Sequence, residues 1–414
     1  MIISVAQLGS RMHYAVPKIL ADHNLLGQFF TDICSDKFPF SILNRIPSVY
    51  LPNAVKRFTT RKVGINNAQV VHFPTLGIHY FSLKKGTASL SDEFGSYNTI
   101  GKQFCEQINH QKWYQSCDAI YLFNTAGKEV AELGKKENKT IILEQCIIPA
   151  EIYFKILEQE ALKFPEWGGK EFLNYASNPV FDTYFERERL EWQLADNIIV
   201  PSKFVQKTLV ELNVPTEKIT VVPYGVKGLD SAQLFNRKPK EHNKNGKLNV
   251  VSIGYLDLRK GIQYYYQLAE IYKGAHFSAI GQFTKLPETI QKKISTCIRI
   301  TGHLNKNEVV NEYLNSDIFM LLTLAEGSAT VIYEALSYGL PVITTNAAGS
   351  IVEHGISGFI VEASDTEGII ACLEKLKQKD FYTTMSQNAL LKSQEGSFDS
   401  YSKNLIESLN RISR

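Results

Sequence analysis

The fold class follows from residues 317–344, Asp-Ile-Phe-Met-Leu-Leu-Thr-Leu-Ala-Glu-Gly-Ser-Ala-Thr-Val-Ile-Tyr-Glu-Ala-Leu-Ser-Tyr-Gly-Leu-Pro-Val-Ile-Thr. Residues 317–322 are almost wholly apolar, which is typical of a strand buried on both faces of a parallel sheet. Residues 328–338 predict a helix that ends at Gly339 and Pro341, and residues 341–345 predict the next strand. Glu326 then lies at the carboxyl end of a strand, where open α/β sheets bind ligands.

The same alternation of strands and helices runs along the rest of the chain. Strands are predicted at 2–6, 27–31, 69–73, 119–123, 140–144, 197–200 and 219–222, and then at 248–254, 277–280, 298–302 and 358–361. Helices are predicted near 14–22, 95–109, 150–162, 180–194, 262–272, 308–315, 366–376 and 401–412, and another begins after Ser202. Two such series predict an α/β protein with two doubly wound, Rossmann-like domains, whose parallel sheets face a central cleft.

A polar, basic stretch, residues 236–247, separates the two series. We therefore place the first domain at residues 1–226, a linker at 227–247 and the second domain at 248–394, with a final helical segment at 395–414.

The loop after the 317–322 strand has the features of an anion site. Gly327 follows Glu326, and the backbone N–H groups of Ser328, Ala329 and Thr330 are expected to open the helix and point into the loop. A helix start of this kind attracts phosphate. Glu334 lies about one and a half turns further along the helix, on a face that can look back into the same cleft.

A second candidate element is Gly254-Tyr-Leu-Asp-Leu-Arg-Lys-Gly261, which follows a predicted strand. Arg259 and Lys260 at the head of a helix are suited to bridging a diphosphate, because both donate to phosphate oxygens. A solvated basic turn is the alternative interpretation.

These residues resemble the signature of retaining glycosyltransferases of family 4, which have the GT-B fold. The likeness rests on Glu326, seven residues, Glu334, and the following Glu-Ala-Leu-x-x-Gly-x-Pro-Val pattern. The resemblance implies that Glu326 contacts hydroxyls of a donor sugar, that Glu334 holds the nucleotide ribose and that Lys260 meets the diphosphate. It further implies that the nucleotide base packs near loops such as Gly281-Gln-Phe, and that the final helix crosses back to the first domain.

Two departures from that family's pattern are visible. Many members have an Arg directly after the first Gly, where this chain has Tyr255, and Arg259 is the candidate substitute. Many also have a His where this chain reads Glu144-Gln-Cys146. Either Glu144 or Gln145 supplies that contact to the sugar, or the sugar is held differently.

Loops of the first domain are the candidates for the other side of the cleft. In Gln7-Leu-Gly-Ser-Arg-Met-His13, Gly9 would let backbone N–H groups approach donor phosphates or the acceptor. Arg11 and His13 are candidate ligands for acceptor or donor oxygens, and Asn124 lies in a loop after another strand. An exposed Arg and a helix-start His are the equally weighted alternatives.

Composition narrows the function classes. The chain is 44% hydrophobic and 21% charged, with a net charge of +3, which is too small to indicate nucleic acid as a partner. Its six scattered cysteines indicate a reduced, cytoplasmic protein without zinc or a disulfide framework. The chain lacks Asp-x-Asp, Gly-x-Gly-x-x-Gly and a Walker loop, so we expect neither a metal nor a nicotinamide cofactor.

Residues 37–91 hold eight Lys or Arg and no acid, with Phe, Tyr and Ile interleaved. Such a stretch suits the cytoplasmic surface of an anionic membrane or a lipid-diphosphate acceptor. A solvated face over core aromatics is the favoured alternative.

The resemblance therefore implies a retaining, metal-independent hexosyltransferase-like enzyme of polysaccharide biosynthesis. It would move a sugar from a nucleotide-diphosphate donor to a hydroxyl of a glycan or lipid-linked saccharide, with the nucleotide sugar as substrate and no separate cofactor. The alternatives are a nucleotide-sugar epimerase or hydrolase on the same fold, and a catalytically silent carbohydrate-binding scaffold.

Overall fold

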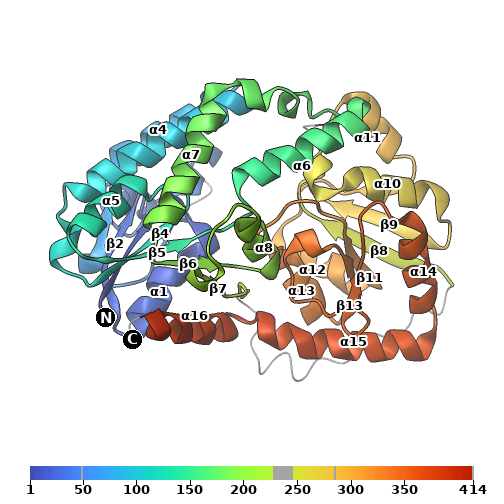
Figure 1. The fold of residues 1–414 in the computed structure, drawn as a ribbon. Helices are drawn as coiled ribbons and strands as arrows, with labels where there is room; N and C mark the ends of the chain where they lie inside the picture. Colours follow the sequence, from blue (N-terminus) through green and yellow to red (C-terminus); the bar gives the residue numbers. More distant parts are fainter. Residues whose placement is uncertain (48–49, 227–245, 284–285, 413–414) are drawn as a thin grey trace.

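A computed structural model describes residues 1–47, 50–226, 246–283 and 286–412. The chain forms two α/β domains side by side, each built on a parallel sheet between helices (Figure 1). Most of the predicted linker, residues 227–245, lies outside the described residues.

Each sheet has the strand order of a doubly wound fold, and every pair of strands is parallel. The first sheet runs β3 (Val70–His72), β2 (Leu26–Thr31), β1 (Ile3–Gln7), β4 (Ala119–Phe123), β5 (Thr140–Glu144), β6 (Asn197–Val200) and β7 (Ile219–Val221). The second runs β10 (Ile298–Ile300), β9 (Ala275–Ile280), β8 (Leu248–Ile253), β11 (Ile318–Leu321), β12 (Val342–Thr344) and β13 (Gly358–Ile360). The predicted fold class is confirmed, and the predicted strands differ from these by at most two residues at an end.

The helices of the first domain are α1 (Ala15–Asp22), α2 (Asn53–Thr59), α3 (Pro74–Gly86), α4 (Leu90–Asn109), α5 (Lys128–Lys136), α6 (Ala150–Lys163), α7 (Pro179–Leu194) and α8 (Lys203–Glu211). After the linker follow α10 (Ile262–Ile271), α11 (Glu288–Ile294), α12 (Lys306–Asn315), α13 (Thr330–Ser337), α14 (Thr366–Leu376), α15 (Lys379–Ser393) and α16 (Phe398–Ile412). The cap predicted at Ser202 is confirmed, because its side chain accepts the N–H of Val205.

The apolar runs of the central strands are explained by helices on both faces of each sheet. In β4, Ile120 and Leu122 belong to one hydrophobic cluster and Tyr121 to another on the opposite face. Both clusters are buried, so β4 lacks the alternation of apolar and polar residues that a strand with one exposed face would show.

Helix α15 was not predicted, because two serines occupy its core-facing positions. Ser386 and Ser393 are buried beside Tyr382, Met385 and Ala389, at helical spacing. Ser386 donates to the Gly339 carbonyl at 2.6 Å, which satisfies its hydroxyl. Because serine counts as a polar residue in a sequence pattern, the periodic apolar face of this helix is not recognisable from the sequence.

The last helix returns to the first domain. Tyr401, Leu405 and Leu409 of α16 are buried in the cluster that contains residues of α1 and β1. The two ends of the chain consequently lie close together (Figure 1).

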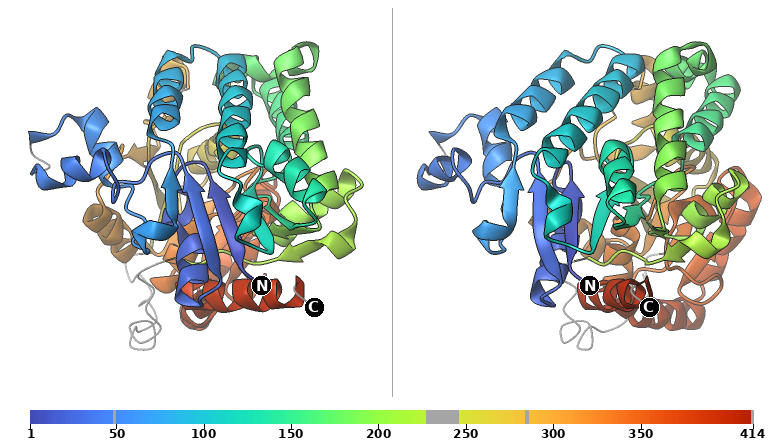
Figure 2. Two further views of the ribbon diagram at one scale, coloured as in Figure 1. Left: turned by 90° about the vertical axis from the view of Figure 1, so that its left-hand side faces the viewer. Right: turned by 60° about the vertical axis from the view of Figure 1, so that its left-hand side comes forward.

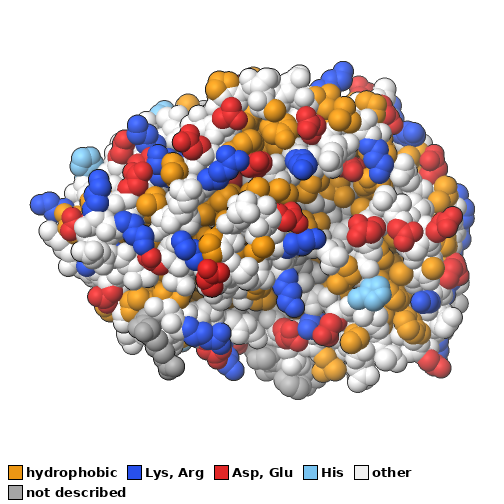
Figure 3. All heavy atoms as spheres, viewed as in Figure 1, with side chains coloured by type: hydrophobic (Ala, Val, Ile, Leu, Met, Phe, Trp, Pro, Cys, Tyr) orange, Lys and Arg blue, Asp and Glu red, His pale blue; other side chains and the backbone are white. Residues whose placement is uncertain are grey.

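A lobe stands out from the side of the first domain (Figure 2). It contains α2 and a short 3-10 helix, η2 (Phe40–Arg45). The surface view shows apolar side chains gathered where the two domains meet (Figure 3). Within the residues that the structure describes, none of the helices is both long and apolar enough to cross a membrane.

Candidate active site

Glu326 and the cationic turn, predicted from separate parts of the sequence, meet in the structure. The Glu326 carboxylate follows β11 and forms ion pairs with both Arg259 and Lys260. All three side chains are largely shielded from solvent, with exposed fractions of 14%, 19% and 13%. Burial alone would raise the pKa of Glu326, but the two cations outweigh it and hold the pKa below its ordinary value.

The turn that carries the cations is fixed by its own residues. Asp257 accepts the backbone N–H of Lys260 at 2.9 Å. Gly261, with φ of 72°, then passes so close to β11 that a Cβ there would lie 1.9 Å from the Leu322 carbonyl oxygen. The cations are therefore locked beside the strand end that carries Glu326.

Two predicted glycines lie next to this group. Gly254 and Gly281 end β8 and β9, and a Cβ on Gly281 would lie 1.8 Å from the Gly254 carbonyl oxygen. The side chain of Lys260 comes within 3.5 Å of the Cβ position of Gly254. Because these glycines have no side chains, the Lys260 side chain can lie next to the ends of β8 and β9.

The loop after Glu326 differs from the prediction in one respect. The helix starts at Thr330 rather than Ser328, with Ala329 as its N-cap. The N–H of Ala329, expected to point at a ligand, instead donates to the Ala348 carbonyl at 2.9 Å. The segment after β12 therefore holds this loop. The prediction that the Ala329 N–H is free to bind a ligand is wrong.

Gly327 is the point at which the domains touch. A Cβ on Gly327 would lie 1.8 Å from the Cys146 carbonyl oxygen of the first domain. The Ser202 hydroxyl, also from the first domain, donates to the Gly327 carbonyl at 2.6 Å. The loop that carries Glu326 is thus pressed against the floor of the cleft.

Glu334 is held away from the cations by a partner of its own. The Tyr313 hydroxyl of α12 donates to its carboxylate at 2.9 Å. Burial raises the pKa of Glu334 above its ordinary value, although the Tyr313 bond opposes the shift. It remains a partly buried acid on the helix that follows Glu326.

The turn after β1 has an unusual backbone. Met12, His13 and Tyr14 have positive φ values of 46°, 50° and 62°, a strained arrangement for residues other than glycine. Arg11 is exposed, and its pKa is raised by Cys146, Tyr224 and Glu144, which lie in the first-domain floor of the cleft. His13 is exposed as well. Sequence reasoning found these residues but not the strained turn.

Gly9 does not offer its own N–H to a ligand. That group donates to Asp32 at 3.0 Å, and Asp32 is in turn paired with Arg61. Any backbone N–H group of this turn that approaches donor phosphates or the acceptor must therefore belong to a residue other than Gly9.

Asn124, Glu144 and Gln145 are buried, and their polar atoms have protein partners. Glu144 accepts the hydroxyls of Tyr121 and Tyr224 at 2.5 and 2.6 Å. Asn124 and Gln145 both donate to Glu188, at 3.2 and 3.0 Å. Both Glu144 and Gln145 are thus engaged within the interior below the cleft, which favours the alternative that the sugar is held differently.

Two acids that the sequence reasoning missed organise this interior. Glu188 of α7 also accepts the N–H of Ala150 at 2.8 Å, and Glu191 accepts those of Thr125, Gly127 and Lys128 at 2.6 to 3.0 Å. Burial raises the pKa of Glu191 to about 7. The only signal was the spacing of three between the acids, which resembles an ordinary charged helix face.

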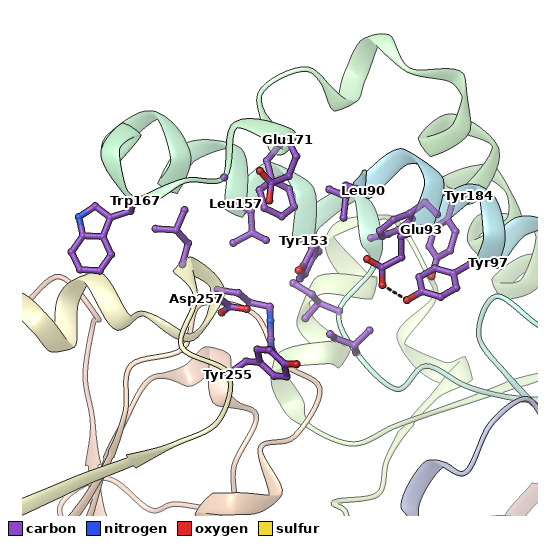
Figure 4. A pocket seen from close by; sticks show the side chains of 18 of the residues that line it. Leu90, Glu93, Tyr97, Tyr153, Leu157, Trp167, Glu171, Tyr184, Tyr255 and Asp257 are labelled. Atoms are coloured by element: carbon purple, nitrogen blue, oxygen red, sulfur yellow. Dashed lines mark hydrogen bonds between the residues drawn. The ribbon is translucent and has the colours of Figure 1, made fainter. Parts of the chain in front are cut away.

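A chamber of about 620 Å³ opens beside Arg259, between α4, α6 and α7 of the first domain and the loop after β8. Trp167 and Asp257 lie at one end of it and Glu93, Tyr97 and Tyr184 at the other, with Tyr153 between them (Figure 4). A second hollow of about 960 Å³, lined by Ser202 and Gly349 among others, also lies between the domains. The first has the size of a site for a small molecule or a sugar unit.

Two parallel-sheet, Rossmann-like domains side by side form the GT-B fold, which solved glycosyltransferase structures share. Residues 247–379 match the family model described as Glycosyl transferases group 1. This match covers most of the second domain, including Arg259, Lys260, Glu326 and Glu334. Together, the match and the fold support a glycosyltransferase.

Solved structures of the same fold align over nearly the whole chain. Anabaena Alr3699/HepE in complex with UDP has a TM-score of 0.62 at 16% identity, covering 99% of this chain and 100% of that one. The lipopolysaccharide outer core galactosyltransferase WaaB has a TM-score of 0.61 at 13% identity, covering 99% of each chain. At these identities the likeness shows the fold.

Curated relatives are similar over shorter stretches. The amylovoran biosynthesis glycosyltransferase AmsK of Erwinia amylovora is 25% identical over 44% of this chain and 48% of its own length. The UDP-Gal:alpha-D-GlcNAc-diphosphoundecaprenol alpha-1,3-galactosyltransferase of Escherichia coli is 26% identical over 43% of this chain and 50% of its own. This chain therefore spans about half the length of these named glycosyltransferases.

Proposed function

We propose that this protein is a retaining glycosyltransferase of polysaccharide biosynthesis that uses a nucleotide-diphosphate sugar. The observation that carries the proposal is the ion-paired group of Glu326, Arg259 and Lys260 at the strand ends of the second domain. Because two cations share one carboxylate, the group keeps a net positive charge with which to attract a diphosphate.

The group has the features needed to stabilise a departing diphosphate. Lys260 and Arg259 are fixed before substrate binds, so little reorganisation is needed as negative charge grows on the leaving group. Glu326 would exchange one of its cation contacts for hydroxyls of the donor sugar, and Glu334 would hold the ribose.

The reaction would be a same-face displacement without a covalent enzyme intermediate. The diphosphate leaves, the acceptor hydroxyl attacks from the same side, and the departing phosphate oxygen takes its proton. The contribution of the chain is positioning and electrostatic stabilisation, with no metal required. The adjacent chamber offers room for an acceptor, which favours transfer over hydrolysis or epimerisation.

The first donors to test carry UDP, since the structural neighbour Alr3699/HepE is described in complex with UDP and UDP-glucose. A donor that binds the folded protein raises its melting temperature. Activity is then measured as loss of UDP-sugar and formation of a glycosylated product with saccharide acceptors.

Two substitutions test the roles of the second domain. Lys260→Ala removes a cation from the leaving group, and Glu334→Gln removes the charge proposed to hold the ribose. We expect transfer to fall by about two orders of magnitude or more in each purified variant, because a single electrostatic contact of this kind is worth about that much. Wild-type turnover in both folded variants contradicts the proposal. Lys375→Ala, an exposed lysine of the same domain, is the control.

We also propose that the projecting lobe touches an anionic membrane and brings the cleft to a lipid-linked acceptor. The structure supports a different interpretation for different aromatic and aliphatic residues of the basic stretch, since some are in the core and others are exposed. Phe40 and Leu51 are buried, whereas Phe38, Ile42 and Tyr50 are 73%, 50% and 77% exposed. Exposed apolar groups in a basic segment without acids are complementary to an anionic lipid surface. The E. coli relative is named for a diphosphoundecaprenol-linked acceptor.

A further inference from the structure

The chamber beside Arg259 has a chemistry that identifies its ligand more closely. We propose that it binds the accepting end of the acceptor, and that this end is an uncharged saccharide ring rather than a phosphate-bearing or acidic group. The inference rests on the proposed transferase function and names the substrate class of its acceptor site.

One wall of the chamber is a fixed aromatic surface. Phe94 and Tyr97 of α4 and Tyr184 of α7 line it, and the ring of Phe94 lies 4.7 Å from that of Tyr184 and 5.6 Å from that of Tyr97. Behind them, Phe94 packs on the fully buried Phe154 at 5.0 Å. The wall is therefore held in place before any ligand arrives, which lowers the entropic cost of binding.

Such a wall suits the apolar face of a pyranose. The faces of aromatic rings carry partial negative charge, and the axial C–H groups of a sugar ring carry partial positive charge. Sugar hydroxyls around the ring edge then need acceptors, and carboxylates accept without donating. Glu93, Glu171 and Asp257 line the chamber to supply them. Glu93 already accepts the Tyr97 hydroxyl and Asp257 the Lys260 N–H, but a carboxylate can accept more than one bond.

The charge balance of the chamber disfavours an anion. Arg259 is already paired with Glu326, and the oxygens of Glu188 accept from Asn124, Gln145 and Ala150. Counted in full, the charged side chains that line the chamber are four acids and two cations, so the lining carries a net negative charge. A phosphate or uronate would therefore meet mostly like charge in a partly desolvated space.

Tyr153 connects the chamber to the reacting centre. Its side chain lines the chamber from α6, together with Arg259 and Asp257 of the second domain. Burial raises the pKa of Tyr153, so the phenol stays protonated and can donate to a sugar oxygen. A hydroxyl held beside Tyr153 lies next to the group proposed to bind the donor.

The test is ligand-detected NMR with methyl glycosides as probes, in the presence of saturating UDP. The panel holds methyl glucoside, galactoside, mannoside and N-acetylglucosaminide, with methyl glucuronide as the charged member. We expect at least one neutral glycoside to bind and the glucuronide to bind at least tenfold more weakly than methyl glucoside or the best neutral member.

Two variants locate the binding. Tyr97→Ala removes an aromatic face and is expected to weaken the neutral glycoside roughly tenfold, the upper end of what such a contact contributes. Glu171→Lys reverses an exposed charge of the chamber and is expected to strengthen glucuronide binding, while Glu137→Lys, exposed elsewhere on the first domain, leaves it unchanged.

The outcomes separate this inference from the proposed function. If UDP binds but no neutral glycoside does, or the glucuronide binds as well as the neutral sugars, the inference is overturned while the donor site stands. Binding that is insensitive to Tyr97→Ala overturns it too. If UDP itself fails to bind, the proposed function fails first.

Discussion

Glu326 illustrates how charge is arranged before substrate arrives. Its carboxylate is shared by Arg259 and Lys260, which lowers its pKa, while burial raises the pKa of Glu334 on the following helix. The two acids of the predicted motif therefore have opposite environments. In the proposed reaction, the diphosphate would compete with Glu326 for the cations, and the carboxylate would be released toward the sugar as the cations engage the phosphates.

Glu191 makes the stability of the fold depend on pH. Its pKa is raised from 4.5 to about 7, so between these values the unfolded chain has released a proton that the folded protein keeps. The unfolding free energy contributed by Glu191 therefore falls as pH rises, by about 1.4 kcal/mol per unit. We expect the stability of Glu191→Gln relative to wild type to rise between about pH 5 and pH 7 and to level off above.

Urea unfolding of both proteins at several pH values measures this difference. Glu137→Gln, which alters an exposed acid on the first domain, should show no such trend. A difference that is constant across the range would mean that Glu191 is ionised in the folded protein throughout.

The strands were predictable because each is a short apolar run between polar turns, and a parallel sheet buries both of its faces. The cationic turn and Glu326 were predictable for a related reason. Both follow strands, and the carboxyl ends of parallel strands share one edge of the sheet. Their meeting therefore depends on topology, which local sequence already indicates.

Side-chain partners could not be predicted in the same way. Asn124 and Gln145 have the chemistry of ligands, and only the course of α7 places Glu188 within reach of both. The polar serines of α15 likewise reveal their burial only when Gly339 lies opposite. Local sequence specifies what a residue can bind, but tertiary structure decides what it does bind.

The projecting lobe predicts a lipid-dependent interaction. Phe38→Ser combined with Tyr50→Ser removes two exposed aromatic side chains and no charge. We expect the wild type to co-sediment with vesicles that contain phosphatidylglycerol, less so at high salt, and the double variant to bind several-fold more weakly.

Leu391→Ser is the matched control, since Leu391 is 56% exposed on α15 of the second domain. An unaffected double variant would place the lobe outside any membrane contact, and equal binding to vesicles of neutral phosphatidylcholine would show that the contact does not recognise anionic lipid.

The two domains meet through backbone at the loop of Glu326, in addition to the aromatic contacts that the end of α6 and the segment after it make with α10. Gly327 lies against the Cys146 carbonyl, and a Cβ on Gly349 would come within 2.2 Å of the Gly327 carbonyl oxygen and 2.6 Å of the Ser202 hydroxyl. Two glycines and a serine thus allow the loop of Glu326 to reach the cleft floor. This backbone contact helps to set the spacing of the two domains at the proposed site.

Gly327→Ala should push the two domains apart at this loop without unfolding either, while the contacts between α6 and α10 stay. Its Cβ would lie 1.8 Å from the Cys146 carbonyl oxygen, a distance that neither backbone can tolerate. We expect a larger radius of gyration by small-angle scattering and a loss of transfer of about tenfold or more, because small displacements of reacting groups are costly. UDP binding should change less, since Lys260 and Arg259 remain in one domain. Gly86→Ala, where an added methyl group meets no atom within 4 Å, is the control. An unchanged radius together with full transfer would show that the loop can move aside, and that the catalytic distance is set elsewhere.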